Sequence, residues 1–284
     1  MGVLRTALCR PETYVGCARE AVSALRCVAR YPLGLAEATL RTGPSRGDET
    51  HDTPVLLVHG YGHNRSGWFP LERALHEAGF SSVHTMNYVA WGKEGVPELA
   101  ARLAERVQQI RRATGAPKVH VIGHSMGGVL LRWYTQELGG ARYVDTAVTI
   151  ASPHEGTVAA LVGVGPGARD LRPGSRVMRR LAAGASRAAG VRWIAFYSNI
   201  DVLVQPAPSA MLRHPAFRAT NILVKDQGHL AILLAPAVAT SVVAQLEAAE
   251  TGAGRLLPLL PAAPVTSPPA AGPADGVVVA DVAF

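Results

Sequence analysis

Short apolar runs alternate with longer amphipathic stretches through the middle of the chain. The short runs are apolar throughout, which is typical of parallel strands covered on both faces, and we expect strands at 55–59, 83–88, 119–123, 146–151, 192–198 and 221–224. Between them, apolar positions recur at helical spacing, and we expect helices at 69–78, 97–114, 126–138, 175–183 and 230–250. This alternation predicts one α/β domain, with a mostly parallel central sheet and helices on both faces.

Two segments of different character flank this domain. The first 41 residues predict an amphipathic helix that ends near Pro32 and a short second helix, because apolar positions recur at three- and four-residue steps. These positions are Tyr14, Ala18, Ala21, Val22, Leu25 and Val28. From Thr251 onward proline and alanine dominate, which prevents a helix and offers little to bury. We therefore expect an N-terminal helical extension and loop over 1–53, the α/β domain over 54–250, and a disordered tail over 251–284.

Composition and charge narrow the class of protein. With 48% apolar and 17% charged residues, the 284-residue chain has the balance of a globular protein. The longest apolar stretch, 230–246, is interrupted by Pro236 and by polar residues, so it is not a membrane span. Arg5 and Arg10 interrupt the place where a secretory signal needs an apolar core. We expect a cytoplasmic protein, with membrane contact only at its surface.

The net charge of +7 is concentrated in one stretch. Between residues 169 and 192 there are seven arginines and one acid, Asp170, and no aromatic residue lies among them. Nucleic-acid binding is therefore disfavoured.

The arginine-rich stretch belongs to a longer segment, 155–190, which is a candidate lid or cap. A helix there places Arg176, Arg179 and Arg180 on one face, which suits either contact with an anionic membrane or ordinary solvation.

The sharpest chemical signal is the pentapeptide Gly123-His124-Ser125-Met126-Gly127. It lies directly after an apolar run and directly before a predicted helix, which is the order of elements in a nucleophile elbow. The glycines allow a sharp bend, and the helix N-terminus behind Ser125 favours a developing negative charge. The pattern predicts that Ser125 is a nucleophile at the carboxyl edge of the sheet, against the simpler interpretation of a turn serine.

A serine nucleophile needs a histidine base, which in this kind of elbow comes last along the chain. Three histidines follow Ser125: His154, His214 and His229. His229 is favoured because it lies in a loop after a predicted strand, at the edge of the sheet where the elbow opens. His154 is disfavoured because few acidic residues precede it, and His214 is disfavoured because it lies next to Pro215.

The base usually needs a carboxylate that orients it, placed between the serine and the histidine in sequence. Asp201 is favoured because it follows the strand predicted at 192–198. Asp226 shares the loop of His229, where a nearby acid is more often solvated. Asp145 begins a strand, which places it at the opposite edge of the sheet.

Together these motifs resemble the bacterial serine lipases and esterases of the α/β-hydrolase superfamily, and most closely the small triacylglycerol lipases. The segments that carry the resemblance are His59-Gly60, Gly123 to Gly128, Ala151 to Thr157, Ser198 to Asp201 and Gly228-His229, within about residues 54–250. The resemblance implies that 54–250 is the catalytic domain and that Ser125, Asp201 and His229 form a triad. It further implies an oxyanion hole made by the backbone amides of Tyr61 and Met126.

We therefore expect a serine carboxylester hydrolase that cleaves acyl esters, with lipids as the expected substrates, and that needs neither a metal nor a cofactor. Two alternatives remain at this stage. An acyltransferase uses the same triad but passes the acyl group to an alcohol. A non-catalytic binding protein on the same fold keeps the architecture without the chemistry.

Overall fold

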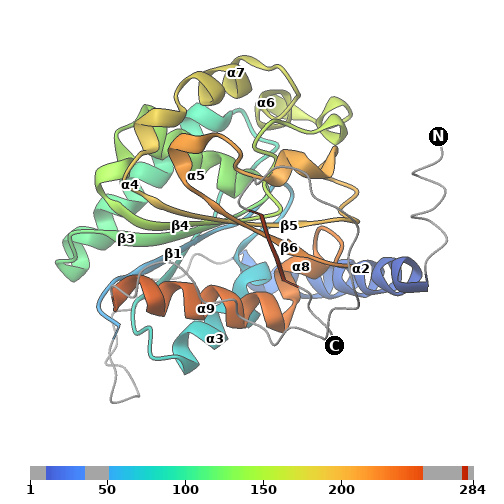
Figure 1. Cartoon of the computed structure of the whole chain (residues 1–284), viewed down its shortest axis with the longest axis horizontal. Coiled ribbons are helices and arrows are strands. Elements are labelled where there is room, and N and C mark those ends of the chain that lie inside the picture. The colour runs from blue at the N-terminus through green and yellow to red at the C-terminus, as the bar shows by residue number, and fades with distance from the viewer. Residues whose placement is uncertain (1–10, 36–50, 252–276, 281–284) are drawn as a thin grey trace, which may run out of the picture.

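A seven-stranded, all-parallel sheet forms the centre of the molecule (Figure 1). The computed structural model describes residues 11–35, 51–251 and 277–280. The strand order is β2-β1-β3-β4-β5-β6-β7. The strands are β1 (Val55–Val58), β2 (Val83–Met86), β3 (Val119–His124), β4 (Val144–Ile150), β5 (Arg192–Ser198), β6 (Thr220–Val224) and β7 (Val277–Ala280). Because every pairing is parallel, the carboxyl ends of all strands meet at one edge of the sheet.

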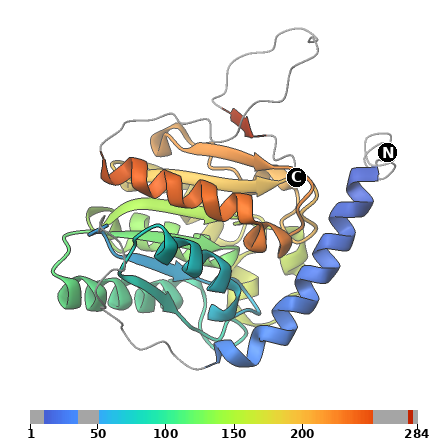
Figure 2. The same cartoon turned by 90° about the horizontal axis from the view of Figure 1, so that it is seen from below.

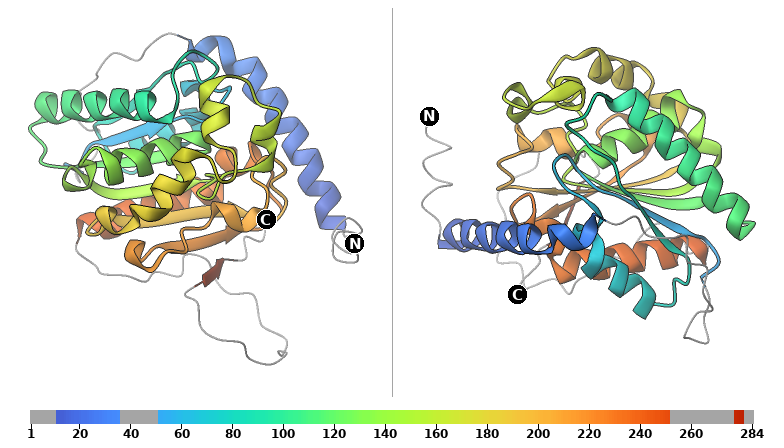
Figure 3. Two further views of the ribbon diagram at one scale, coloured as in Figure 1. Left: turned by 90° about the horizontal axis from the view of Figure 1, so that it is seen from above. Right: turned by 180° about the vertical axis from the view of Figure 1, so that it is seen from behind.

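Helices cover both faces of the sheet, which confirms the predicted architecture (Figures 1 and 3). One face carries α4 (Val96–Thr114), α5 (Met126–Glu137), α6 (Gly165–Asp170) and α7 (Arg176–Ala183), and the other carries α3 (Phe69–Glu77) and α9 (Pro236–Glu250). Alternate residues of a strand point to opposite faces. Accordingly Leu56 and Val58 of β1 belong to the core under α4 and α5, whereas Val55 and Leu57 belong to the core under α3 and α9.

Short 3-10 helices connect these elements. They are η1 (Tyr31–Gly34), η2 (Arg65–Trp68), η3 (Gly140–Arg142), η4 (Val158–Leu161), η5 (Ala185–Ala188), η6 (Ala207–Ala210) and η7 (Pro215–Phe217). Three of them, η2, η4 and η6, follow the carboxyl ends of β1, β4 and β5, and three others, η3, η5 and η7, precede the amino ends of β4, β5 and β6. Within the described ranges, no helix combines the length and the apolar character that a bilayer span needs.

The helix predicted over 230–250 is two helices, so this part of the prediction is wrong. A short α8 (Ala231–Leu234) ends before Ala235, which is extended with φ −71° and ψ 122°, and α9 begins at Pro236. Proline has no amide to donate and pushes the residue before it out of the helical region. The break separates the loop around His229 from the long helix that packs on the sheet.

The N-terminal helix α2 (Pro11–Arg30) lies across the edge where the strands end (Figure 2). The amphipathic pattern correctly predicted a helix, but its apolar positions do not face the domain. All six, from Tyr14 to Val28, are exposed. The domain side of the helix instead carries the buried small residues Gly16, Ser23 and Cys27, together with the half-buried Glu20.

The expected C-terminal tail lies mostly outside the described residues. Its described part, Val277–Ala280, forms β7 and pairs in parallel with β6, in a register that places Val277 beside Asn221. For these four residues the prediction of a tail without regular structure is wrong. Parallel addition at the sheet edge suits a run of valines, because β-branched residues favour strands.

Candidate active site

Ser125 lies at a sharp turn between β3 and α5. Its backbone has φ 52° and ψ −122°, a conformation that residues with a side chain rarely adopt. The turn is held by hydrogen bonds from the Ser125 amide to the Ile150 carbonyl at 2.9 Å and from the Gly128 amide to the Ser125 carbonyl at 3.1 Å. The predicted strand, turn and helix therefore form, with Ser125 at the carboxyl edge of the sheet.

Two glycines permit the close packing of this turn. A Cβ atom on Gly127 would collide with the backbone carbonyl of Val58 in β1. A Cβ atom on Gly60 would lie 2.7 Å from the Cβ atom of Ser125, closer than real Cβ atoms approach other groups. The chain after β1 thus passes directly beside the serine, because residue 60 has no side chain.

His59 holds that neighbouring segment in place. Its Nδ1 donates to the Gly60 carbonyl at 2.8 Å, and its Nε2 accepts from the Tyr88 amide at 3.1 Å. Its ring stacks on that of Tyr88, with ring centres 4.1 Å apart. Burial lowers the pKa of His59 to about 4, so the ring is neutral at neutral pH and can keep both hydrogen bonds.

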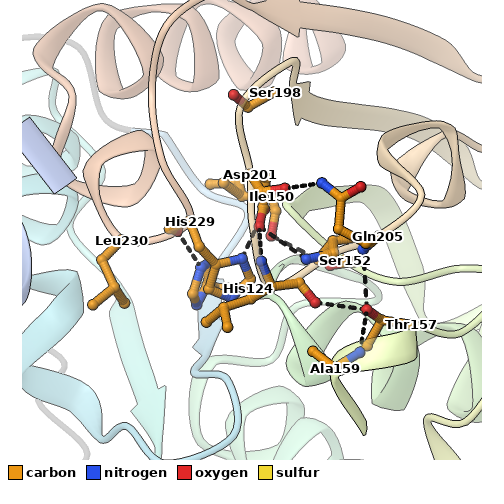
Figure 4. Close-up of polar contacts among 12 residues, drawn as sticks. His124, Ile150, Ser152, Thr157, Ala159, Ser198, Asp201, Gln205, His229 and Leu230 are labelled. Atoms are coloured by element: carbon orange, nitrogen blue, oxygen red, sulfur yellow. Dashed lines mark hydrogen bonds and ion pairs between the residues drawn. The ribbon is translucent and has the colours of Figure 1, made fainter. Parts of the chain in front are cut away.

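His229 and Asp201 form a buried pair at the same edge (Figure 4). The Nδ1 of His229 donates to Oδ2 of Asp201 at 2.7 Å, and both side chains are almost completely buried. The other carboxylate oxygen, Oδ1, accepts from the amides of Leu203 at 2.8 Å and Val204 at 2.9 Å. With Nδ1 occupied by the carboxylate, Nε2 of His229 is left to accept a proton.

The electrostatic environment keeps Asp201 ionised. Burial alone disfavours its charged form, but the hydrogen bond and charge of His229, together with the two loop amides, outweigh burial and lower the pKa of the carboxyl. An ionised Asp201 fixes the orientation of the His229 ring and stabilises the imidazolium that forms when the ring takes up a proton.

Contacts from several elements hold the backbone around His229. His124 donates from Nε2 to the His229 carbonyl at 3.1 Å, and its own pKa lies well below the ordinary value because the ring is buried and near other histidines. The hydroxyl of Ser198 donates to the Gln227 carbonyl. The loop that carries the histidine is thus fixed on both sides of residue 229.

Glu20 of α2 completes this support, and the sequence analysis missed it. Its carboxylate accepts from the Leu230 amide at 3.0 and 3.1 Å and from the Ala231 amide at 2.8 Å. Gly228 packs directly against the Glu20 side chain, so that a Cβ atom there would collide with it. No local signal could have found this residue, because its partners lie more than two hundred positions along the chain.

The two amides expected to form an oxyanion hole belong to residues beside the serine turn. Tyr61 follows the His59-Gly60 turn, and Met126 follows Ser125 as the first residue of α5. In the described part of the chain, neither amide donates a hydrogen bond to another group. The Tyr61 hydroxyl donates to the Val164 carbonyl at 2.7 Å, which ties this turn to the segment before α6.

The competing candidates lie elsewhere. His154 is buried with its Nε2 on the Thr149 hydroxyl at 3.0 Å, and burial lowers its pKa well below the ordinary value. His214 is exposed and caps η7, where it accepts from the Ala216 amide. Asp226 accepts from the Asn199 side chain at 3.2 Å. Asp145 lies at the opposite edge, 3.6 Å from His120.

A cavity of about 640 Å³ opens beside the serine, and both Ser125 and His229 line it. Its volume lies in the range of small-molecule sites. Tyr61, Leu171 and Leu203 contribute to its walls, and the N-terminal extension contributes Ala24, Cys27, Val28, Tyr31 and Pro32. No Asp, Glu, Lys or Arg is among the described residues that line it. The cavity therefore suits an apolar group next to Ser125.

The two halves of segment 155–190 differ in their relation to this cavity. The first half lines it, from Thr157 to Leu171. In α7 the apolar side chains of Val177, Met178 and Leu181 are buried in the core, so they are not available for a lipid surface. Arg180 lies 2.6 Å from Glu137, which Arg187 also contacts. The packing of α7 therefore favours ordinary solvation of its arginines, and contact of this helix with a membrane stays a prediction.

Comparison with known proteins agrees with the fold. Residues 53–168 match the family described as the alpha/beta hydrolase fold. A triacylglycerol lipase of Pseudarthrobacter phenanthrenivorans is 31% identical over 111 residues, which is 37% of this chain and 34% of that protein. A triacylglycerol lipase of Burkholderia plantarii is 31% identical over 111 residues, 37% of this chain and 30% of that protein. The chain thus spans about a third of the length of these relatives.

Solved structures share the architecture. Mature Bacillus licheniformis lipase BlEst2 matches with a TM-score of 0.61 at 16% identity, over 72% of this chain and 96% of that one. Aspergillus fumigatus lipase B matches with a TM-score of 0.63 at 20% identity, over 74% of this chain and 55% of that one. The chain has the α/β-hydrolase fold, and bacterial lipases are among its sequence relatives.

Proposed function

We propose that this protein is a serine carboxylester hydrolase, an esterase or lipase that forms an acyl-enzyme on Ser125. The observation that carries the proposal is the buried pair of His229 and Asp201 at the same strand edge as the strained serine turn, with His229 and Ser125 lining one cavity. A strained turn, a histidine with a free Nε2 and an ionised partner are the parts that nucleophilic acyl transfer requires.

In the proposed mechanism, His229 takes the hydroxyl proton at Nε2 while Ser125 Oγ attacks the ester carbonyl. The negative charge that develops on the carbonyl oxygen is accepted by the amides of Tyr61 and Met126. The tetrahedral intermediate collapses when His229 returns the proton to the leaving alkoxide, and Asp201 stabilises the imidazolium between these two transfers. A water molecule, activated by the same histidine, then releases the acid.

The cavity points to an apolar acyl group as the part of the substrate that is recognised. An acyl chain gains free energy by leaving water for walls without charged side chains, at about 25 cal/mol per Å² of apolar surface buried. The triacylglycerol lipases among the relatives act on substrates of this chemical class, as their names state. We therefore propose lipid esters as substrates, handled by residues 54–250 with one cavity wall supplied by the N-terminal extension.

The test is turnover of p-nitrophenyl esters of increasing chain length, together with labelling by a fluorophosphonate. Ser125→Ala is expected to lose both the label and, on the order of 10³-fold or more, the turnover. Ser186→Ala, which changes an exposed serine in η5, serves as the matched control and should retain both. Wild-type turnover in Ser125→Ala would refute the mechanism. Transfer to an added alcohol in preference to water would identify an acyltransferase instead.

A further inference from the structure

The outward face of α2 is apolar along its length. Five large side chains on this face are exposed: Tyr14 by 66%, Val15 by 49%, Val22 by 49%, Leu25 by 69% and Val28 by 70%. Positions seven apart lie on the same side of a helix, so Val15 and Val22 follow one another along it. An amphipathic helix normally buries such a face, and an exposed one marks an interaction surface.

This face continues into the rim of the cavity. Val28 of α2, Val162 after η4 and Leu203 in the Asp201 loop are all exposed, and all three also line the cavity. Further exposed apolar side chains are Leu33, Leu35, Val89, Trp91, Val158, Leu161, Val164 and Val202. Val28 thus belongs to both surfaces, and whatever covers α2 also meets the mouth of the cavity beside the serine.

Basic side chains lie along one edge of the same helix. Arg26 and Arg30 are exposed and four positions apart, which places them on one side. Among the side chains described in α2, the acidic one is Glu20, and it is turned toward the backbone amides of Leu230 and Ala231. The outward surface of the helix therefore combines apolar residues with positive charge, a combination suited to a helix lying in the headgroup region of an anionic lipid layer.

We propose that the outward face of α2 and the apolar rim of the cavity dock on an anionic lipid surface, with the mouth of the cavity turned toward the lipid. A second copy of the chain on this face would also cover the cavity mouth and shut out substrate. A lipid surface instead delivers an ester to it. The orientation of the cavity mouth toward the lipid rests on the proposed function. Docking itself needs only the apolar face of α2 and its arginines.

The experiment measures binding of the full chain to phosphatidylcholine vesicles with and without phosphatidylglycerol, in the Ser125→Ala background so that no lipid is hydrolysed. Val22→Gln with Leu25→Gln is expected to weaken binding roughly tenfold or more, because two apolar side chains lose their burial. Arg26→Gln with Arg30→Gln should remove most of the preference for phosphatidylglycerol. Salt should weaken vesicle binding by the Ser125→Ala protein without further changes, because ions screen the attraction between its arginines and the anionic headgroups.

Two controls match these variants. Leu138→Gln changes an exposed apolar residue after α5, and Arg112→Gln changes an exposed arginine of α4. Both variants should bind vesicles as tightly as the Ser125→Ala protein without further changes. Circular dichroism melts establish that each variant is folded. The proposal would be overturned if the variant with Val22→Gln and Leu25→Gln bound vesicles as tightly as the Ser125→Ala protein. It would also be overturned if the Ser125→Ala protein itself did not bind vesicles. A dimer in solution that the same two substitutions dissociate would likewise overturn it.

The two proposals fail in different ways. Turnover of a soluble short-chain ester by the wild-type chain, without vesicle binding, contradicts docking and leaves the proposed hydrolase intact. Vesicle binding without any ester turnover by the wild-type chain supports docking and contradicts the hydrolase.

Discussion

Glu20 and Leu230 lie 210 residues apart in the sequence, yet the Glu20 carboxylate accepts a hydrogen bond from the Leu230 amide at 3.0 Å. Leu230 directly follows His229, so the N-terminal helix holds the loop that carries the proposed base. On the same side of α2, Gly16 lies against Ile200 and the Asp226 carbonyl. Helix α2 therefore braces both of the loops that supply the His229 and Asp201 pair.

Glu20→Gln tests whether this brace positions His229. Glutamine keeps the size of the side chain but loses the charge and one of the two accepting oxygens. We expect kcat on a soluble short-chain ester to fall roughly threefold to tenfold with KM little changed, because a positioning fault acts on the reaction step more than on substrate binding. Glu77→Gln, in an exposed pair with Arg73, is the control and should match the wild type. Wild-type kcat in Glu20→Gln would show that the contact only supports the fold.

The proposed triad predicts non-additive losses. His229→Ala and the double variant with Ser125→Ala should be about equally inactive, since the two side chains act as one unit. Asp201→Asn should lose somewhat less of its ester turnover than His229→Ala does. His154→Ala is the control for a buried histidine, and its ester turnover per folded molecule should stay near that of the wild type. Inactivity of folded His154→Ala alongside an active His229→Ala would show that the base is assigned to the wrong residue.

The N-terminal wall of the cavity predicts control of acyl chain length. Ala24→Phe adds a ring to the lining, and turnover of long-chain relative to short-chain p-nitrophenyl esters should fall on the order of tenfold, since a filled pocket excludes methylene groups. Ala21→Phe places the same ring on the exposed side of the same helix and should leave the ratio unchanged. An unchanged ratio in Ala24→Phe would mean that the acyl chain lies elsewhere.

Glu250 at the far end of α9 predicts a pH-dependent contribution to stability. Burial opposes its ionisation, but contacts with His120, His51 and Thr53 outweigh burial and lower the pKa of the carboxyl to about 2. A carboxyl with a lowered pKa in the folded state stabilises the fold above its ordinary pKa, and this stabilisation is lost as the pH falls toward 2.

Glu250→Gln should therefore lower the free energy of unfolding at neutral pH by roughly 1.5–3 kcal/mol, typical of hydrogen bonds to a charged group. Urea unfolding of wild type and variant should show this difference shrinking as the pH falls below 4.5, the ordinary value for this carboxyl. A difference that stays constant with pH would mean that packing, and not charge, accounts for the loss.

The sequence by itself determined the sheet and the serine turn, because both depend on local patterns. Short apolar runs are typical of buried strands, and the six strands predicted between 55 and 224 are all present, whereas the seventh, β7, was not predicted. Gly123 and Gly127 around Ser125 define a bend that few other residues allow. The order of serine, acid and histidine along the chain favoured Asp201 and His229. In the structure His229 Nδ1 lies 2.7 Å from Asp201 Oδ2.

Only the tertiary structure decided how distant segments meet. The pattern in α2 correctly predicted a helix, but which side faces the domain depends on surfaces that periodicity does not encode. Small residues such as Gly16 fit against the loops that carry Asp201 and His229, which leaves Leu25 and Val28 outside. Likewise the partners of Glu20 are backbone amides, which every residue carries, so no sequence signal distinguishes them. Such contacts arise when the folded chain brings unrelated segments together.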